Sequence, residues 1–183
     1  MSEFERVLIT KAEIDRRAAA LAAELDRDYA GKNPLFIGIL KGSVFFFSDL
    51  LQKLTIEAEM DFIAISSYGA GTSSSGYVRI IKDLDRHING RHVVIVEDMV
   101  DSGTTLSHLK EVLSTREPAS IAICALLSKP SRRKTPVDID YLGFEVPDEF
   151  VVGYGLDYAE RYRVLPDVRI LDRSVYEQTE EDK

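Results

Sequence analysis

The chain has 183 residues, of which 45% are apolar and 30% charged, and its formal net charge is −8. This acidic balance disfavours general nucleic-acid binding, which needs a basic face. Length and apolar content predict a single domain over residues 1–183. No apolar run is long enough for a membrane span, and the N-terminus lacks a signal-peptide profile. The single cysteine, Cys124, lies in an apolar run and allows no disulfide within the chain, so a cytoplasmic protein is expected.

The first third of the chain predicts alternating helices and strands. Apolar residues repeat on one face over residues 9–27, which predicts a helix. Leu35–Leu40 predicts a buried strand, and an apolar helix follows Lys41-Gly42-Ser43. The aromatic run at residues 44–47 fits a core and an interface equally well. Another strand is predicted over residues 60–65.

Residues 66–76 form a segment of small and polar residues around one large side chain, Tyr68. Such composition is typical of a flexible linker. Both flanks, residues 60–65 and 77–81, are strand-like, so we expect a flexible lid loop rather than a link between domains. At the other end of the chain, the acidic residues 177–183 predict a disordered tail.

The pattern with the most functional information begins at residue 93. Residues 93–96 are apolar and β-branched, as in a strand buried on both faces of a parallel sheet. Glu97 and Asp98 follow directly, and Asp101 then opens a turn that leads into a helix predicted over residues 106–116. Ligands of open α/β sheets bind at such positions, where the free N–H groups of a helix start suit a phosphate.

The composition of the turn predicts a cradle for a phosphorylated sugar. Ser102, Thr104 and Thr105 supply hydroxyl groups, and Gly103 permits positive φ or close approach to a ligand. Because the turn has no Lys or Arg, it is not a Walker-type loop. Amides would hold the phosphate, while the acids accept ribose hydroxyl protons or help to hold a metal. An ordinary turn accounts poorly for three acids and three hydroxyls around one glycine.

The last part of the chain continues the α/β pattern with a strand over residues 121–127 and short strands over residues 140–144 and Val168–Leu171. Between them, residues 128–134 form a basic run in an acidic protein. By charge pattern alone this run fits a solvated loop and a functional cation cluster equally well.

Residues 93–105 resemble, without a gap, the phosphoribosyl-diphosphate-binding motif of the type I phosphoribosyltransferases. Further matches narrow the resemblance to the hypoxanthine(-guanine) phosphoribosyltransferases, namely Leu40-Lys41-Gly42, Ser67-Tyr68, Lys129 and residues 150–158. These purine-salvage enzymes convert a 6-oxopurine and phosphoribosyl diphosphate into a nucleoside monophosphate and pyrophosphate. The resemblance implies a mostly parallel twisted sheet with helices on both faces, a small hood and a lid loop.

The resemblance also implies roles for the residues that bind phosphoribosyl diphosphate. Lys41 and Gly42 would bind the pyrophosphate part, often through a non-proline cis peptide. Arg163 would add positive charge there, with Arg133 as a further candidate. Glu97 and Asp98 would accept hydrogen bonds from the ribose hydroxyls. The 5′-phosphate would lie in the turn formed by Asp101, Ser102, Gly103, Thr104 and Thr105.

For the base, the resemblance implies that Phe150 stacks on the purine and that backbone groups near Val151 bond its edge. Lys129 would donate to the exocyclic O6, which disfavours adenine because that buried donor would then lack a partner. Asp101 would act as the general base for the purine N7 proton. The implied cofactor is Mg²⁺, held by Asp157, with Glu97 and Asp98 touching it or only the ribose. Ser67 and Tyr68 would belong to the lid that excludes water.

Two other functions fit parts of the pattern. Some proteins that resemble this superfamily are nucleotide sensors that bind nucleic acid, but the acidic chain, the lack of an appended basic domain and the purine-site residues disfavour a sensor. Transfer to a pyrimidine or to adenine is disfavoured by Lys129 and Phe150. The preference among hypoxanthine, guanine and xanthine stays open. The resemblance implies a homo-oligomer, with dimer and tetramer both open.

Overall fold

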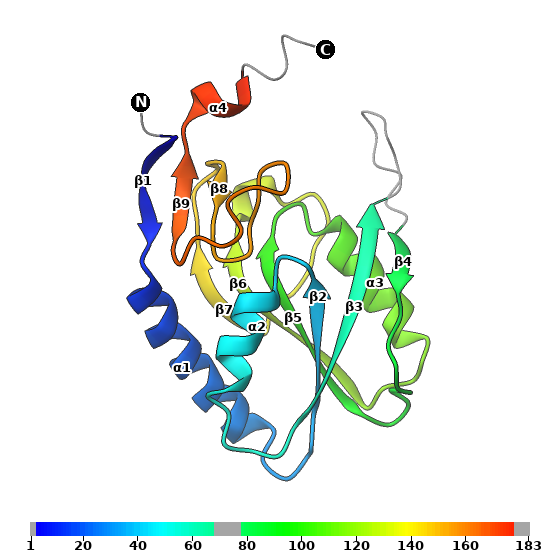
Figure 1. Cartoon of the computed structure of the whole chain (residues 1–183). Helices are drawn as coiled ribbons and strands as arrows, with labels where there is room; N and C mark the ends of the chain where they lie inside the picture. The colour runs from blue at the N-terminus through cyan, green and yellow to red at the C-terminus, as the bar shows by residue number, and fades with distance from the viewer. Residues whose placement is uncertain (1–2, 68–77, 178–183) are drawn as a thin grey trace.

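The computed structural model describes residues 3–67 and 78–177. Two sheets organise these residues, as Figure 1 shows. Six strands form the larger sheet in the order β4-β3-β2-β5-β6-β7, and three strands form the smaller one in the order β1-β9-β8. Most of the predicted lid, residues 68–76, and residues 178–183 of the predicted tail lie outside the described residues. Within the described ranges, no helix combines the length and apolar character needed to cross a membrane.

The elements follow one another along the chain as β1 (Phe4–Ile9), α1 (Lys11–Asp28), β2 (Leu35–Leu40), α2 (Val44–Leu51), β3 (Glu59–Ser67), β4 (Val78–Lys82), β5 (His92–Val100), α3 (Thr104–Ser114), β6 (Ser120–Ser128), β7 (Tyr141–Glu145), β8 (Val151–Val152), β9 (Val168–Leu171) and α4 (Arg173–Glu177). A short 3₁₀ helix, Pro130–Arg132, follows β6. In the larger sheet β4 is antiparallel to β3, and the other neighbouring strands are parallel.

The first helix begins two residues later than the sequence pattern predicts. Thr10 caps it, because its hydroxyl accepts from the Glu13 backbone N–H while the Glu13 carboxylate accepts from the Thr10 N–H at 2.8 Å. This reciprocal pair is a capping box, which determines where a helix starts. Ile9 therefore belongs to β1, a strand that the apolar pattern did not predict and that pairs with β9 far along the chain.

The central strand β5 is longer than the predicted residues 93–96. It continues to Val100 because its backbone pairs with β6 as far as the Val100–Ser128 match. Glu97 and Asp98 thus lie inside the strand and not after its end, which corrects the sequence-based boundary. Neighbouring strand residues start on opposite faces of a sheet, yet these two carboxylates remain close enough for Asp98 to raise the pKa of Glu97.

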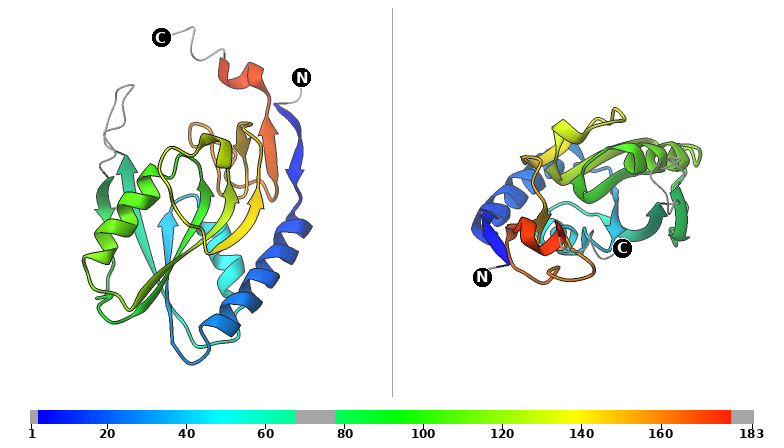
Figure 2. Two further views of the ribbon diagram at one scale, coloured as in Figure 1. Left: turned by 180° about the vertical axis from the view of Figure 1, so that it is seen from behind. Right: turned by 90° about the horizontal axis from the view of Figure 1, so that it is seen from above.

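Helices cover both faces of the larger sheet, as predicted. Helices α1 and α2 pack on one face and α3 on the other, as the front and back views show (Figures 1 and 2). The aromatic run of α2 is divided between core and surface: Phe46 and Phe47 are buried, whereas Phe45 is 39% exposed.

The order of the strands creates a crevice beside β2 and β5. These two strands are adjacent and parallel, and the chain continues outward from them in opposite directions, to β3 on one side and β6 on the other. Such a switch point leaves a ligand crevice beyond the carboxyl ends of the strands. Lys41 directly follows β2 and Asp101 directly follows β5, so the fold brings both motifs to this crevice. The smaller sheet and the loop after β8, together called the hood here, stand over the same end (Figure 1).

Candidate active site

The turn after β5 is shaped by one glycine. Gly103 has a φ of 79° and precedes the first residue of α3, so Thr104 and Thr105 lie in the first helical turn. The N–H groups of a first turn have no partner within the helix and suit an anion. A Cβ atom at Gly103 would come within 2.5 Å of the Thr135 carbonyl oxygen. The turn is also anchored through Ser102, whose carbonyl accepts from the Thr135 N–H at 3.0 Å. We call residues 101–105 the cradle.

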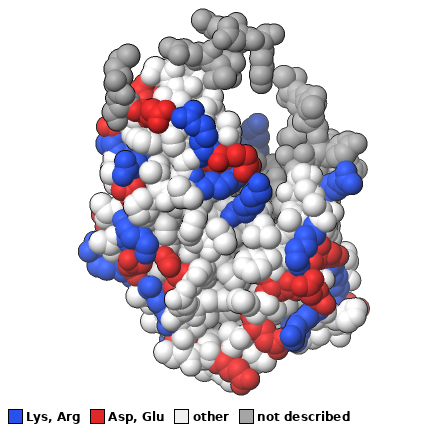
Figure 3. Space-filling model, in the orientation of Figure 1, with Lys and Arg blue, Asp and Glu red and all other residues white. Residues whose placement is uncertain are grey.

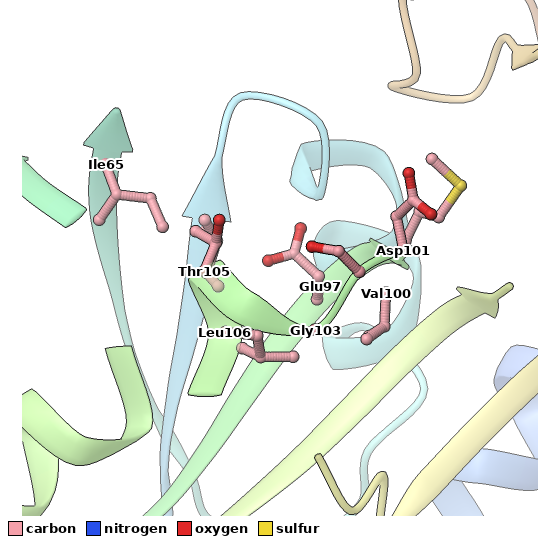
Figure 4. Close-up of a pocket in the computed structure, with 10 residues that line it drawn as sticks. Ile65, Glu97, Val100, Asp101, Gly103, Thr105 and Leu106 are labelled. Atoms are coloured by element: carbon pink, nitrogen blue, oxygen red, sulfur yellow. The ribbon is translucent and has the colours of Figure 1, made fainter. Parts of the chain in front are cut away.

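A cavity of about 310 Å³ lies above the cradle. Figure 4 shows Glu97, Asp101 and Thr105 around it, at the end of β5 and the start of α3. Its polar lining comes from the cradle and from β5, and apolar side chains form the rest of the wall. The lining residues are Ile39, Ile65, Glu97, Met99, Val100, Asp101, Ser102, Gly103, Thr105 and Leu106. One wall therefore offers hydroxyl and amide donors and another offers a carboxylate.

A second cavity, of about 400 Å³, lies between the end of β5 and the hood. It is lined by Asp98, Met99, Asp101, Lys129, Arg132, Phe150, Val151, Leu156 and Asp157. Met99 and Asp101 line both cavities, so the two spaces adjoin at these side chains. A ligand with a phosphate in the cradle can therefore extend past Asp101 under the hood.

Lys129 is buried in the wall of this hood cavity. Only 4% of the residue is exposed, and its Nζ donates to the Glu149 carbonyl oxygen at 2.7 Å. Burial lowers the pKa of Lys129. An ammonium has three N–H donors, so donors remain for a ligand beside the one given to Glu149. The basic run at residues 128–134 is thus no simple solvated loop, because one of its cations lies inside a cavity.

Phe150 presents an aromatic ring at the mouth of the hood cavity. The residue is 36% exposed. Tyr158 meets its ring edge-on, with centroids 5.5 Å apart, and Tyr176 of α4 stacks on it at 5.1 Å. Two neighbouring rings therefore hold Phe150 in place, which makes it a preformed surface for a flat ligand.

Two cations face acidic partners at the hood. Lys41 Nζ lies 3.0 Å from Glu160 Oε2, and Arg163 Nη2 lies 3.2 Å from Glu160 Oε1 and 2.9 Å from Asp157 Oδ1. These cations lower the pKa of Glu160. In Figure 3, basic and acidic side chains lie side by side in clusters that uncharged surface separates. Lys41 and Arg163 thus place positive charge beside carboxylates at the hood of a chain whose net charge is −8.

The backbone at Lys41 approaches the acid pair closely. The peptide bond between Leu40 and Lys41 is cis, one bond before the Lys41-Gly42 bond. A Cβ atom at Gly42 would lie 1.7 Å from Asp98 Oδ2, so only glycine leaves room for that carboxylate. Burial and the neighbouring Asp98 carboxylate together raise the pKa of Glu97. Ligand hydroxyls or a cation would stabilise the ionised pair.

The two arginines after Lys129 have different contacts. Arg132 Nε lies 3.2 Å from Asp101 Oδ1, and Arg132 lines the hood cavity. Arg133 instead donates to the Asp101 carbonyl oxygen at 2.9 Å and to the Ser128 hydroxyl at 2.8 Å. Arg133 therefore braces the cradle from behind, and Arg132 is the arginine of this run that faces the cavity.

Comparisons with known proteins agree with this geometry. The family model described as "Phosphoribosyl transferase domain" matches residues 9–159. The hypoxanthine-guanine phosphoribosyltransferase of Bacillus subtilis is 52% identical over 175 residues, which are 96% of this chain and 97% of that protein. The chain belongs to the phosphoribosyltransferase family.

Other phosphoribosyltransferases are similar over nearly the whole chain. The hypoxanthine phosphoribosyltransferase of Escherichia coli is 49% identical over 168 residues, covering 91% of this chain and 94% of its own. A crystal structure of the hypoxanthine phosphoribosyltransferase from Staphylococcus aureus matches with a TM-score of 0.93 and 45% identity, covering 95% of each chain. The predicted resemblance and the type I phosphoribosyltransferase fold are confirmed.

The structure brings most of the predicted site residues of this phosphoribosyltransferase to two adjoining cavities. Glu97, Asp101, Ser102, Gly103 and Thr105 line the cradle cavity, and Asp98, Asp101, Lys129, Phe150, Val151 and Asp157 line the hood cavity. The Thr104 hydroxyl instead lies 3.0 Å from the Thr135 hydroxyl. Ser67 ends β3, and Tyr68 lies outside the described residues.

Three residues of the site were not singled out from the sequence. Met99 lies inside the recognised motif, and its place between Asp98 and Asp101 could have identified it as a site residue. Arg132 belongs to the basic run, where nothing in the pattern separates it from Arg133. Glu160 gave no signal, because an exposed acid is ordinary in an acidic chain until the fold sets it against Lys41 and Arg163.

Proposed function

We propose that this phosphoribosyltransferase is a Mg²⁺-dependent enzyme of purine salvage that acts on hypoxanthine, guanine or both. It transfers the phosphoribosyl group of phosphoribosyl diphosphate to N9 of the base and releases pyrophosphate. The observation that carries the proposal is the buried Lys129 ammonium, which shares a cavity with Phe150 and meets the cradle cavity at Asp101. The names of the relatives support the same activity.

The hood cavity suits a 6-oxopurine. Phe150 stacks on the flat ring, and backbone groups at Val151 bond its edge. Lys129 donates to O6 while Glu149 keeps one of its hydrogen bonds. Adenine carries an amino group at this position and would leave the N–H of Lys129 that faces the base without an acceptor, which is the kind of mismatch that gives strong discrimination.

The cradle cavity suits the 5-phosphoribosyl group. Ser102, Gly103, Thr104 and Thr105 surround the 5′-phosphate with N–H and hydroxyl donors. Glu97, which lines this cavity, and Asp98, which lines the adjoining hood cavity, accept hydrogen bonds from the ribose hydroxyls.

The pyrophosphate part lies between the loop after β2 and the hood. Lys41, Gly42 and Arg163 bind it, so its oxygens take the place that Glu160 holds beside the two cations. Asp98 and Asp157 line one cavity and offer carboxylate oxygens. This fits Mg²⁺, which usually takes one or two carboxylates and substrate phosphates. When bound, Mg²⁺ stabilises negative charge on the leaving pyrophosphate.

Transfer forms a bond between purine N9 and ribose C1′ while the bond from C1′ to the pyrophosphate oxygen breaks. Asp101 lies where the two cavities meet, beside both the sugar and the base, and takes the N7 proton as general base. The residues around it hold the two reactants in line, which removes much of the entropic cost of their encounter.

The test is an assay of the purified protein with phosphoribosyl diphosphate, Mg²⁺ and each base in turn. We expect pyrophosphate release with hypoxanthine, guanine or both, and a kcat/KM with adenine that is lower by roughly five- to 150-fold or more, since an unpaired buried donor costs on the order of 1–3 kcal/mol and a charged one more. Adenine used as well as hypoxanthine, or no transfer to either 6-oxopurine, would reject the assignment.

We further propose a cytoplasmic homo-oligomer, a dimer or tetramer. Exposed apolar side chains at the start of α2, Val44 at 37% and Phe45 at 39%, lie next to the Lys41 loop and support an interface there. Light scattering after size-exclusion chromatography tests this, and a monomer at assay concentration would reject it.

A further inference from the structure

A buried tyrosine ties three elements together just outside the site. The Tyr154 hydroxyl donates to Asp49 Oδ2 at 2.6 Å, and Lys11 Nζ lies 3.0 Å from the same oxygen. Tyr154 follows β8 and is 3% exposed, Asp49 lies in α2, and Lys11 begins α1. Burial, with Asp49 beside it, raises the pKa of Tyr154, so the phenol remains a donor. This cluster joins the hood to the layer of helices below it.

Tyr154 holds an unusual backbone conformation. Its φ is 50°, between Gly153 at 94° and Gly155 at 103°. Positive φ costs free energy in a residue with a side chain, so such a conformation persists only where surrounding contacts enforce it. The hydrogen bond to Asp49 and the packing of the ring supply contacts of this kind. The tyrosine side chain thereby determines where the neighbouring Gly155 lies.

Gly155 touches both cation-bearing parts of the proposed pyrophosphate site. A Cβ atom on it would lie 1.9 Å from the Gly42 carbonyl oxygen, so its backbone rests directly on the loop that carries Lys41. The Gly155 carbonyl also accepts from Arg163 Nη1 at 2.7 Å, and its N–H donates to the Arg163 carbonyl at 2.9 Å. One residue thus sets the distance between the Lys41 loop and the Arg163 guanidinium.

We propose that Asp49 and Tyr154 form a latch that positions Gly155, and through it sets the spacing of Lys41 and Arg163 for the pyrophosphate group. Both are positioning residues, because neither lines the two cavities described above. The inference rests on the proposed function, which assigns Lys41, Gly42 and Arg163 to pyrophosphate. Loss of the latch should weaken binding of phosphoribosyl diphosphate and of pyrophosphate, and leave the purine site as it is.

The chain offers a matched control. Tyr141 of β7 is 9% exposed, and its hydroxyl donates to Asp28 Oδ2 at 2.9 Å at the far end of α1. Tyr141→Phe and Tyr154→Phe each remove one phenol–carboxylate hydrogen bond from a buried ring. Only Tyr154 lies beside Gly155. A general effect of losing such a bond should therefore appear in both variants, whereas an effect of the latch should appear in Tyr154→Phe alone.

The experiment compares wild type, Tyr154→Phe, Asp49→Ala, their combination and Tyr141→Phe in the full chain. The readouts are the Kd of inorganic pyrophosphate with Mg²⁺, the separate KM values of phosphoribosyl diphosphate and hypoxanthine, and Tm. We expect the pyrophosphate Kd and the phosphoribosyl diphosphate KM of Tyr154→Phe to rise roughly three- to tenfold, because a net hydrogen bond corresponds to about a factor of ten or less. The hypoxanthine KM should stay within about twofold. The double variant should match Tyr154→Phe in the pyrophosphate Kd, because Asp49 acts on Gly155 only through the tyrosine, whereas loss of the Asp49 pair with Lys11 should appear in Tm.

Arg163→Ala separates failure of the latch from failure of the proposed function. If Arg163→Ala leaves the pyrophosphate Kd unchanged, the assignment of the site itself is wrong. If Arg163→Ala weakens pyrophosphate binding while Tyr154→Phe and Asp49→Ala do not, the latch alone is rejected. Equal changes in Tyr141→Phe and Tyr154→Phe, or equal rises in both KM values, also reject it.

Discussion

The cradle and the hood loop take opposite ends of one proposed substrate, and they are built in different ways. The cradle is a run of five consecutive residues that joins the end of β5 to the first turn of α3, with a single positive φ at Gly103. The hood loop has positive φ at residues 153–155, 159, 160 and 162, and depends on partners far along the chain. Tyr154 and Asp49 are 105 positions apart, and Lys41 and Glu160 are 119 apart. Local sequence shapes most of the first region, which Arg133 and Thr135 support from outside, and contacts between distant residues shape the second.

This difference determines how each region should respond to mutation. A side-chain change in the cradle leaves its backbone supported by the start of α3, so the loss should appear in the chemistry. A backbone change in the hood should appear in stability and ligand binding. Four predictions, in order of decreasing expected effect, concern the cradle, the hood, the hood cavity and, for comparison, an ion pair outside these regions.

Asp101→Asn should lower kcat by roughly 10²–10⁴-fold and leave the fold intact, because the amide keeps the shape of the side chain but cannot take a proton. Steady-state kinetics and Tm measure the two parts of this expectation. Asp148→Asn is the matched control. Asp148 also pairs with Arg132, with Arg132 Nη1 3.3 Å from Asp148 Oδ1, but it lies outside the cradle. Near-normal turnover of Asp101→Asn would remove this carboxylate from the chemistry.

Gly155→Ala should destabilise the protein by about 3 kcal/mol or more and weaken pyrophosphate binding, since a strained φ adds to a clash with backbone. The new Cβ atom would lie 1.9 Å from the Gly42 carbonyl oxygen. Gly31→Ala provides the comparison, because Gly31 has a φ of 72° but a Cβ atom there would meet no other atom within 4 Å. Urea unfolding of both variants separates the effect of the steric clash at Gly155 from the effect of positive φ. Equal losses in the free energy of unfolding would mean that the contact between Gly155 and the Lys41 loop contributes nothing.

Lys129→Ala should raise the KM of hypoxanthine far more than that of phosphoribosyl diphosphate. The variant loses one charge-assisted hydrogen bond to the base, worth about 1.5–3 kcal/mol, or roughly ten- to 150-fold. Steady-state kinetics with each substrate varied separately measure the two changes in KM. Similar rises in both KM values would point to a structural role for Lys129 in the hood cavity.

Arg116→Ala should have the smallest effect, about 0.2–1 kcal/mol of stability at pH 7, because the pair is partly exposed. Arg116 binds both carboxylate oxygens of Asp83, at 2.7 and 2.9 Å, beyond the far end of α3. This contact lowers the pKa of Asp83 below its ordinary value of 3.8. The contribution is therefore present above pH 3.8 and lost as the pH falls through the lowered pKa. Urea unfolding at about pH 7 and about pH 3 should show the difference between variant and wild type shrinking, and an unchanged difference would contradict this origin.

Most of the sheet could be predicted because buried strands carry continuous apolar residues, which the chain shows at residues 35–40, 93–96 and 121–127. The boundaries were less predictable. The acid pair looked like the end of β5, yet pairing with β6 extends the strand to Val100. In the same way β1 could not be predicted, because its partner β9 lies near the other end of the chain.

The sequence by itself indicated the cradle, since its glycine and the helix start depend on residues only a few positions apart, whereas the end of β5 depends on its pairing with β6. It also predicted which side chains carry the chemistry, because their types and order match the family motif. Only the tertiary structure decided that Lys129 is buried while its basic neighbours are not, that Arg132 and not Arg133 faces the cavity, and that Tyr154 reaches Asp49. Those contacts join residues that are far apart in the sequence. Their geometry follows from the packing of the sheet, the helices and the hood, and no local sequence pattern encodes that packing.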